Sequence, residues 1–183
     1  SYGFGELVKD ALDEGVREFI LTLGGSATTD GACGMACALG IRFLNSLGEE
    51  FIPLGESLAD ISRIDLTNLD SRVTESRFTV MCDVNNPLYG PSGAAYVYGP
   101  QKGATKDDLL LLDKGLSNLC SVFKSMTGKD YSVLPGGGAA GGAGFGCVAF
   151  LNATLKSGIE LMLDLSFPYF IFFFSKKLLL RSL

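Results

Sequence analysis

The chain has 183 residues, 47% of them hydrophobic, and a formal net charge of -5. This length allows one sizeable core and favours one domain or a domain plus part of another, and the hydrophobic share is ordinary for a globular protein. The acidic balance argues against nucleic acid as a partner, because such binding depends on clustered Lys and Arg and no basic run occurs before Lys176. The absence of histidine excludes Ser-His-Asp and Cys-His nucleophiles and His-ligated zinc, so any catalytic base must be a carboxylate or a lysine.

The first two expected elements are a helix and a strand. Apolar residues recur at helical spacing within Phe4–Glu14, and Gly15 stands where a left-handed cap would end that helix. The next segment, Val16–Leu23, is rich in branched and aromatic residues and is almost continuously apolar. This pattern predicts a buried parallel strand rather than an edge strand.

A glycine pair and several polar side chains follow this strand directly, in the sequence FILTLGGSATTDGACG at residues 19–34. Glycines let the backbone approach a ligand closely, and free amides near the start of a helix attract anions. The hydroxyls of Ser26 and Thr28 and the carboxylate of Asp30, beside Gly24 and Gly25, therefore indicate a site for phosphate or hydroxy-acid oxygens. We expect Ser26 and Thr28 to face a cleft. Helix capping is the alternative role of these polar residues.

The middle of the chain is expected to contain a short helix, a hairpin and a second strand. The helix should cover Ala32–Leu39, and the hairpin should pair Ile41–Leu44 with Glu50–Ile52. The strand should cover Arg77–Asp83. Asp83 then lies at its carboxyl end, where ligands gather in open α/β sheets.

Asp83 belongs to the segment CDVNNPL, which supplies several hard oxygen ligands. Its carboxylate is followed by the amides of Asn85 and Asn86, and such oxygens suit Mg²⁺, so Asp83 is the preferred metal ligand or base. Asp and Asn before Pro also build turns, which is the alternative role of this segment.

Lys102 lies in the segment YGPQKGAT, in a turn between Gly99-Pro100 and Gly103. An ammonium at this place could neutralise charge on a transferring phosphoryl group. A solvated surface lysine is the alternative. The segment is not a P-loop, because Gly103 stands where that motif needs Ser or Thr.

A long helix and a glycine-rich loop follow. An apolar stripe of leucines ending at Phe123 predicts a helix from Thr105 to Gly128. Residues 135–146 form a glycine-alanine loop before a short apolar helix expected near Cys147–Leu155, so Gly138 and Gly141 either line a ligand cleft or allow close packing. Their G-x-G-x-x-G spacing with Gly136 matches a dinucleotide loop only formally, because the preceding strand would be short.

The last eighteen residues differ from the rest of the chain. They contain FPYFIFFF followed by SKKLLLRSL, and Pro168 interrupts an apolar run that is too short to span a bilayer. We therefore expect an α/β region over residues 1–165 and an aberrant hydrophobic tail over residues 166–183 that packs poorly. A frameshift or premature end is the origin that we infer for this tail. Five cysteines without C-x-x-C spacing, and no secretory leader, indicate a reduced cytoplasmic setting.

The segments SYGFGEL, LGGSATTDG, CDVNNPL, YGPQKGA and PGGGAAGGAG occur in this order between Ser1 and about Asp164. In this order they resemble the bacterial type I glycerate kinases. The resemblance implies an α/β fold with a layered mixed sheet and flanking helices, here an incomplete piece of a two-domain kinase with its active site between the domains. The family's opening D-S-F-K-G and D-G-G-E-G patterns and its closing E-G-x-x-D segment do not occur in this chain.

The resemblance also implies a reaction, the transfer of the ATP γ-phosphate to D-glycerate with Mg²⁺ as the metal. Together with the residue patterns, it makes Asp83, Lys102 and Asp30 the candidate catalytic residues, with Asp83 also the metal ligand. The candidate substrate- or nucleotide-binding residues are Gly24, Gly25, Ser26, Thr28, Asn85, Gly138 and Gly141. The alternatives are a catalytically inactive or weakly ligand-binding product and, as a distant third, a dehydrogenase.

Overall fold

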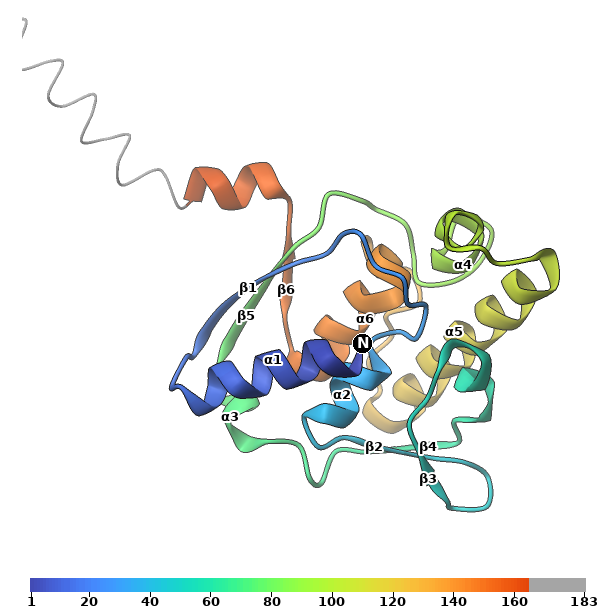
Figure 1. Cartoon of the computed structure of the whole chain (residues 1–183), viewed down its shortest axis with the longest axis horizontal. Coiled ribbons are helices and arrows are strands. Elements are labelled where there is room, and N and C mark those ends of the chain that lie inside the picture. Colours follow the sequence, from blue (N-terminus) through green and yellow to red (C-terminus); the bar gives the residue numbers. More distant parts are fainter. Residues whose placement is uncertain (165–183) are drawn as a thin grey trace, which may run out of the picture.

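The computed structural model describes residues 1–164, whose strands form two sheets (Figure 1). The first sheet is parallel, with the strand order β1-β5-β6, and consists of β1 (Glu18–Thr22), β5 (Arg77–Met81) and β6 (Thr154–Lys156). The second is antiparallel, with the order β3-β2-β4, and consists of β2 (Arg42–Leu44), β3 (Glu50–Phe51) and β4 (Arg63–Asp65). The fold class is α/β, as predicted, and the mixture of strand directions is divided between two sheets.

The helices alternate with these strands along the chain. They are α1 (Tyr2–Asp13), α2 (Cys33–Ala38), α3 (Ser71–Thr74), α4 (Ala94–Tyr98), α5 (Lys106–Thr127) and α6 (Ala139–Leu151), with 3₁₀ helices η1 (Gly55–Asp60) and η2 (Pro100–Lys102). Residues 158–164 are also helical. No helix among the described residues is both long enough and apolar enough to cross a membrane.

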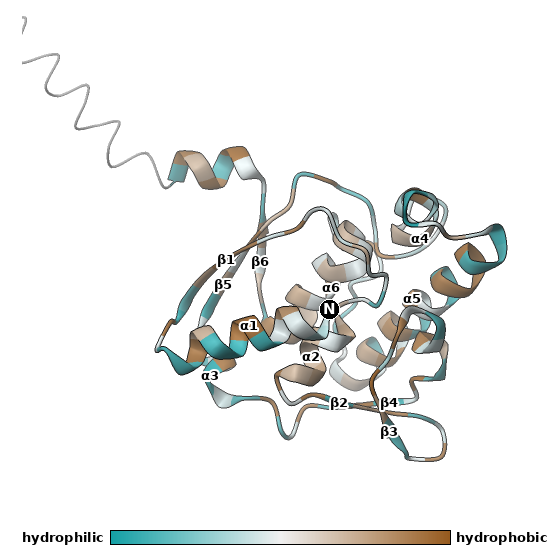
Figure 2. Cartoon of the chain, in the orientation of Figure 1, coloured by the Kyte–Doolittle hydropathy of each residue, from teal (hydrophilic) through white to brown (hydrophobic). Residues whose placement is uncertain are grey.

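The long helix α5 begins and ends as the sequence predicts. Thr105 and Asp108 form a reciprocal capping box, in which the Thr105 hydroxyl accepts from the Asp108 amide and the Asp108 carboxylate accepts from the Thr105 amide. Gly128 ends the helix with a left-handed φ of 73°. Leu116, Leu119 and Phe123 are buried along one face, and Figure 2 shows both apolar and polar residues along α5.

One face of the parallel sheet is covered by helices. Side chains of α1, α2 and α6 pack with Leu21, Phe78 and Val80 in one core cluster, and the Phe19 and Phe78 rings stack with centroids 4.7 Å apart. Figure 2 shows α6 largely in white to brown, which suits a helix buried between layers. This arrangement fixes the carboxyl ends of β1, β5 and β6 at one edge of the sheet.

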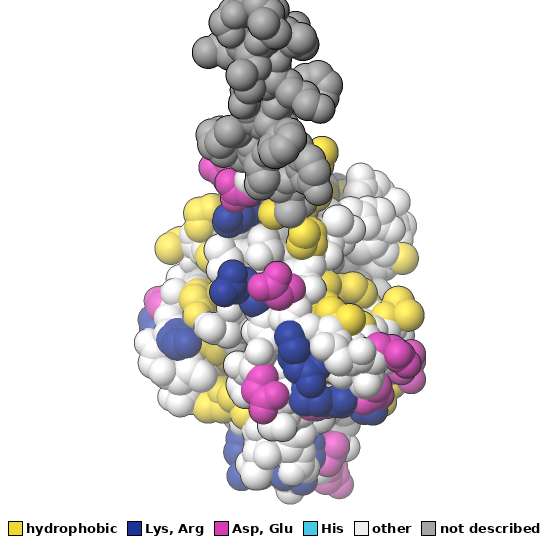
Figure 3. All heavy atoms as spheres, turned by 90° about the vertical axis from the view of Figure 1, so that its left-hand side faces the viewer, with side chains coloured by type: hydrophobic (Ala, Val, Ile, Leu, Met, Phe, Trp, Pro, Cys, Tyr) yellow, Lys and Arg dark blue, Asp and Glu magenta, His cyan; other side chains and the backbone are white. Residues whose placement is uncertain are grey.

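The prediction that the first strand is an interior one is wrong for the described residues. β1 lies at the edge of the sheet and pairs with β5 alone, and Ile20 on its other face is 48% exposed. An apolar run reports how hydrophobic a strand is, and it carries no information on how many strands flank it. Figure 3 shows the face on the left of Figure 1, where basic, acidic and apolar side chains are interspersed.

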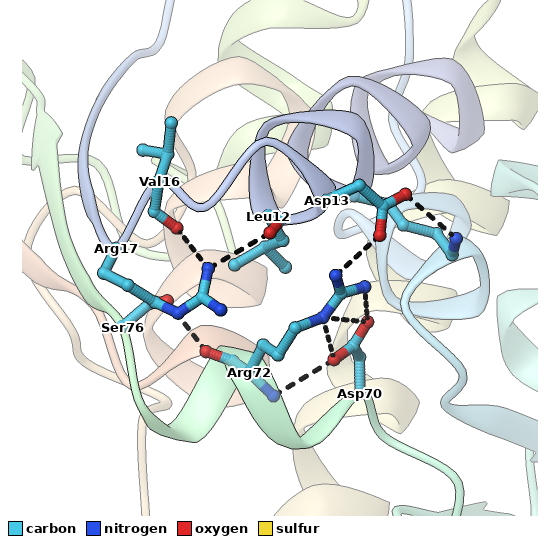
Figure 4. Close-up of polar contacts among 8 residues, drawn as sticks. Leu12, Asp13, Val16, Arg17, Asp70, Arg72 and Ser76 are labelled. Carbon is cyan, nitrogen blue, oxygen red and sulfur yellow. Dashed lines mark hydrogen bonds and ion pairs between the residues drawn. The ribbon is translucent and has the colours of Figure 1, made fainter.

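An ion-pair network joins the end of α1 to the start of α3 (Figure 4). The Arg72 guanidinium donates to the carboxylates of Asp13 and Asp70, both at 2.6 Å, and Asp70 also caps α3. Nearby, the Arg17 guanidinium donates to the carbonyls of Leu12 and Val16. These contacts hold the turn between α1 and β1 and thereby the position at which β1 starts.

The prediction for the chain after residue 135 is only partly right. The helix expected near Cys147–Leu155 is α6, which begins eight residues earlier and is followed by the unpredicted strand β6. Its first turn is interrupted by left-handed backbone at Ala140, Gly141 and Gly142. The short elements β4, α3 and α4 were also not predicted, because three to five residues carry too little periodicity. The expected tail, residues 166–183, lies outside the described residues.

Candidate functional site

The loop after β1, residues 23–29, leaves its backbone amides available. The Leu23 amide donates the last bond of the strand, to the Met81 carbonyl at 3.3 Å. Within residues 1–164, no backbone amide of residues 24–29 donates a hydrogen bond to protein. A Cβ atom added at Gly24 or Gly25 would meet no heavy atom within 4 Å, and Gly25 has a φ of 61°. The loop therefore combines N–H donors with open space, as an anion site requires.

A cavity of about 230 Å³, called here the cradle cavity, lies on one side of this loop. Its lining includes Gly24, Ser26, Ala27, Thr28, Ala140 and Ala143. Ser26 and Thr28 therefore border a cleft, as expected from the sequence. The small side chains of Ala140 and Ala143 form part of the wall, together with Phe4 and Leu23. Sequence reasoning missed the two alanines, because alanine carries no functional signature.

Lys102 reaches this loop from η2. Its Nζ atom donates to the Ser26 hydroxyl at 3.0 Å and to the Thr28 carbonyl at 2.5 Å. Burial lowers the pKa of the Lys102 ammonium, and the negative charge of Asp30 partly opposes this shift. Lys102 is thus a partly buried, held cation beside the free amides, and it differs from a solvated surface lysine.

Asp83 lies at the same edge of the parallel sheet, two residues beyond the end of β5. Its side chain is exposed, and its Oδ1 atom accepts from the Gly158 amide at 2.7 Å. Asp83 borders neither the cradle cavity nor the cavity near Lys102. The structure therefore places it beside the loop at the sheet edge, without a direct contact to Lys102, Ser26 or Thr28.

Asp30 is buried, and its carboxylate is hydrogen-bonded within the protein. It is 5% exposed, and its carboxylate accepts from the Ser1 hydroxyl at 2.7 Å and from the Ala32 and Gly34 amides at 3.1 and 3.4 Å. The Ser1 hydroxyl accepts in turn from the Met35 amide. This network fixes the chain between the loop and α2.

Gly138 and Gly141 let the glycine-rich segment pack against two loops. A Cβ atom at Gly141 would lie 2.0 Å from the Thr28 carbonyl oxygen, and one at Gly138 would lie 2.3 Å from the Pro87 carbonyl oxygen. The Gly31 amide also donates to the Gly141 carbonyl at 3.1 Å. These contacts show close packing, which is one of the two roles that the sequence leaves open for these glycines. The packing at Gly141 supports the loop after β1.

Asn86, rather than Asn85, holds the loop after β5. Asn85 is exposed, whereas the Asn86 side chain accepts from the Tyr98 hydroxyl at 2.7 Å and donates to the Ser92 carbonyl at 2.8 Å. The Asp113 carboxylate accepts from the Gly90 amide in the same loop. Asp113 sits within the apolar pattern of α5, where sequence reasoning offered no reason to select it.

A second cavity, called here the α5 cavity, has a volume of about 340 Å³ and lies beside Lys102. Its lining includes Ala27, Thr29, Glu56, Lys102, Leu111 and Leu112. Ala27 borders both cavities, so the loop after β1 forms part of the wall of each. Within residues 1–164, no group of three or more His, Cys, Asp or Glu side chains gathers as a metal site.

The chain matches a known protein family. A model of the glycerate kinase family matches residues 1–167. The chain is 48% identical to a glycerate kinase of Halalkalibacterium halodurans over 164 residues, which are 90% of this chain and 43% of that protein. It is 44% identical to a glycerate 2-kinase of Escherichia coli over 162 residues, which are 88% of this chain and 42% of that protein.

A solved structure agrees with these matches. It comes from Salmonella typhimurium LT2, belongs to a protein assigned as glycerate kinase 2, and shares 43% sequence identity and a TM-score of 0.86 with this chain. The match covers 89% of this chain and 44% of that one. The chain thus spans less than half the length of the relatives that it matches. Because the family match includes the loop after β1, Asp83, Lys102 and the glycine-rich segment, the chain belongs to the glycerate kinase family.

Proposed function

We propose that this chain carries a phosphoryl-transfer site of an ATP-dependent glycerate kinase, which moves the γ-phosphate of ATP to a hydroxyl of D-glycerate. One observation carries the proposal: the Lys102 ammonium is held against Ser26 and Thr28, beside a run of unpaired backbone amides. Phosphoryl transfer depends mainly on positioning and charge neutralisation, and a fixed cation with N–H donors supplies both. Family membership supports the reaction class.

The residues have separate roles in this proposal. The amides of residues 24–29 and the hydroxyls of Ser26 and Thr28 bind anionic oxygens, and Lys102 neutralises charge on the transferring group. The D-glycerate hydroxyl oxygen bonds to the γ-phosphorus while the bond from that phosphorus to the bridging oxygen breaks. ADP leaves with the electron pair of the broken bond. The proton of the attacking hydroxyl passes through a water molecule to Asp83, because Asp83 lies at the same sheet edge without bordering the cradle cavity.

Mg²⁺ would supply further charge neutralisation on the phosphate oxygens when bound. Asp83 is the residue that fits it, because its carboxylate is exposed at the sheet edge and Mg²⁺ commonly takes only one or two carboxylates in addition to phosphates and water. Asn85, also exposed, offers a further oxygen nearby in the chain. Asp30, Gly138 and Gly141 act in this proposal by positioning the loop.

The proposed setting is the cytoplasm. All five cysteines lie among the described residues and are free thiols, which fits a reducing compartment. A second candidate function is ligand binding without turnover. It is favoured by the position of Asp83, which is exposed and borders neither the cradle cavity nor the α5 cavity.

The test combines binding and turnover. The purified chain is titrated with ATP and with D-glycerate in a calorimeter, and ADP formation is measured with ATP, Mg²⁺ and D-glycerate. We expect slow, D-glycerate-dependent ADP formation that falls by roughly tenfold or more in Lys102→Ala and in Asp83→Asn. The control is Lys129→Ala, at an exposed position near the far end of α5.

Each result has a defined meaning. Robust turnover that neither Lys102→Ala nor Asp83→Asn changes would contradict the proposed site. Binding of both ligands with no ADP formation supports the second candidate. Binding of neither ligand rejects both functions for this chain.

A further inference from the structure

The two cavities on either side of the loop after β1 differ in size. The cradle cavity, at about 230 Å³, is smaller than the usual pocket for a drug-sized ligand, whereas the α5 cavity, at about 340 Å³, falls within that range. A three-carbon hydroxy acid suits the smaller space. A purine nucleoside needs the larger one.

The polar groups on the walls of the two cavities also differ. The α5 cavity has an apolar wall made by Leu111 and Leu112 on α5, and Leu111 is 42% exposed although α5 has a well-formed buried face. An apolar wall of this kind suits the face of a heterocyclic base. The cradle cavity also has an apolar wall, formed by Phe4, Leu23 and alanines, but no charged side chain of residues 1–164 borders it. Its polar groups include the hydroxyls of Ser26 and Thr28, beside the free amides of the loop, and these suit carboxylate and hydroxyl oxygens.

Three charged side chains border the α5 cavity. Lys102 stands at the loop side, where phosphates would meet it. Glu56 and Asp108 also border the cavity. The Asp108 carboxylate already caps α5, whereas the Glu56 side chain is exposed and makes no hydrogen bond or ion pair within residues 1–164. A free carboxylate repels phosphate and accepts hydrogen bonds from ribose hydroxyls.

We propose that the α5 cavity binds the nucleoside of the nucleotide, with its base against Leu111 and Leu112 and its ribose at Glu56, while the cradle cavity binds the hydroxy acid. The loop after β1 then separates donor from acceptor, and Lys102 lies between them where the phosphoryl group passes. This inference rests on the proposed function and assigns residues to each of its two substrates.

The test uses four probes on the full chain: ATP, adenosine, inorganic tripolyphosphate and D-glycerate, each titrated calorimetrically. The affinity for adenosine measures binding of the nucleoside part alone, and the affinity for tripolyphosphate measures binding of the phosphate part alone. The main variant is Leu111→Gln, which removes an apolar wall without adding charge. Leu110→Gln is the matched control, because Leu110 is the preceding residue on α5, is 60% exposed and does not border the cavity.

We expect Leu111→Gln to weaken binding of ATP and adenosine about fivefold and to leave tripolyphosphate and D-glycerate within about twofold. Leu110→Gln should resemble the unaltered chain with all four probes. Glu56→Ala should change the affinities for two probes in opposite directions. Adenosine should bind more weakly because a hydrogen-bond acceptor is lost, and tripolyphosphate should bind more tightly because a negative charge is lost.

The nucleoside assignment would be overturned if Leu111→Gln and Leu110→Gln changed the affinity for adenosine equally. It would also be overturned if the chain bound neither adenosine nor ATP. Weaker D-glycerate binding in Leu111→Gln with unchanged ATP binding would also overturn it, because the two sites would be reversed. Nucleoside binding that depends on Leu111 in a chain that does not bind D-glycerate leaves the cavity assignment standing and removes the proposed kinase acceptor. The two failures are therefore distinguishable.

Discussion

Lys102 Nζ lies 3.0 Å from the Ser26 hydroxyl oxygen, although 76 residues separate them in the sequence. Ser26 belongs to the loop after β1, and Lys102 ends the short helix η2, which follows α4. The loop is also packed from behind by the glycine-rich segment at Gly141. The cation is therefore held at the free amides by two parts of the chain that are distant in sequence.

Anion affinity should fall with rising pH earlier than at an ordinary lysine site. Burial lowers the pKa of Lys102 from its usual 10.5, and the charged form is the one that binds anions. Binding is thus complete below the lowered pKa and is lost as the pH rises through it. Tripolyphosphate affinity, measured from about pH 7 to about pH 10, should decline in the unaltered chain. Lys102→Arg should give a flatter profile, because a guanidinium stays charged; parallel profiles would contradict the assignment.

Local patterns predicted the long elements, while the site depended on tertiary contacts. The capping box at Thr105 and the left-handed Gly128 defined α5 correctly from sequence alone. Glycines and hydroxyls likewise marked the loop after β1. The contact of Lys102 with Ser26, the alanine wall and the burial of Asp30 arise only when distant segments pack together. For the same reason, an apolar run could not show that β1 lies at an edge.

Gly141→Ala should destabilise the fold strongly. Gly141 has a φ of 72°, and an added Cβ atom would lie 2.0 Å from the Thr28 carbonyl oxygen, so both strain and a backbone clash oppose the substitution. We expect a loss of about 2–4 kcal/mol in the free energy of unfolding, measured by urea denaturation. Gly3→Ala in α1 is the control, because its nearest neighbour lies 3.9 Å away and alanine favours a helix. Equal stability of the two variants would show that the segment can shift.

Arg72→Ala should destabilise the protein modestly, and more at neutral than at acidic pH. The Arg72 hydrogen bonds lower the pKa values of Asp70 and Asp13, so these carboxylates contribute stability above their unfolded pKa near 3.8. That contribution is lost as the pH falls through their lowered folded pKa values. The pairs are partly exposed, so the effect should be small.

Urea unfolding near pH 7 and near pH 3 would measure this dependence. The difference between Arg72→Ala and the unaltered chain should shrink at the lower pH. Arg63→Ala provides the comparison, because Arg63 is exposed on β4 and its side chain makes no hydrogen bond or ion pair within residues 1–164. A difference that is independent of pH would mean that Arg72 acts through packing.

Asp30→Ala should lower stability by about 2–4 kcal/mol, because it leaves the Ala32 and Gly34 amides and the Ser1 hydroxyl without their buried acceptor. Asp30→Asn keeps one acceptor oxygen and should lose less. Asp10→Ala, at an exposed position on α1, controls for the loss of a carboxylate.

The Asp30→Asn variant also separates positioning from catalysis. Asp30 is 5% exposed and does not border the cradle cavity, so tripolyphosphate affinity well below the melting temperature should stay within about twofold of the unaltered chain. Its unfolding midpoint should fall at the same time, because the substitution weakens the network that fixes α2. Unchanged melting together with lost anion binding would instead mean that the carboxylate meets the ligand directly, and the loop would then have to open towards α2 when the ligand binds.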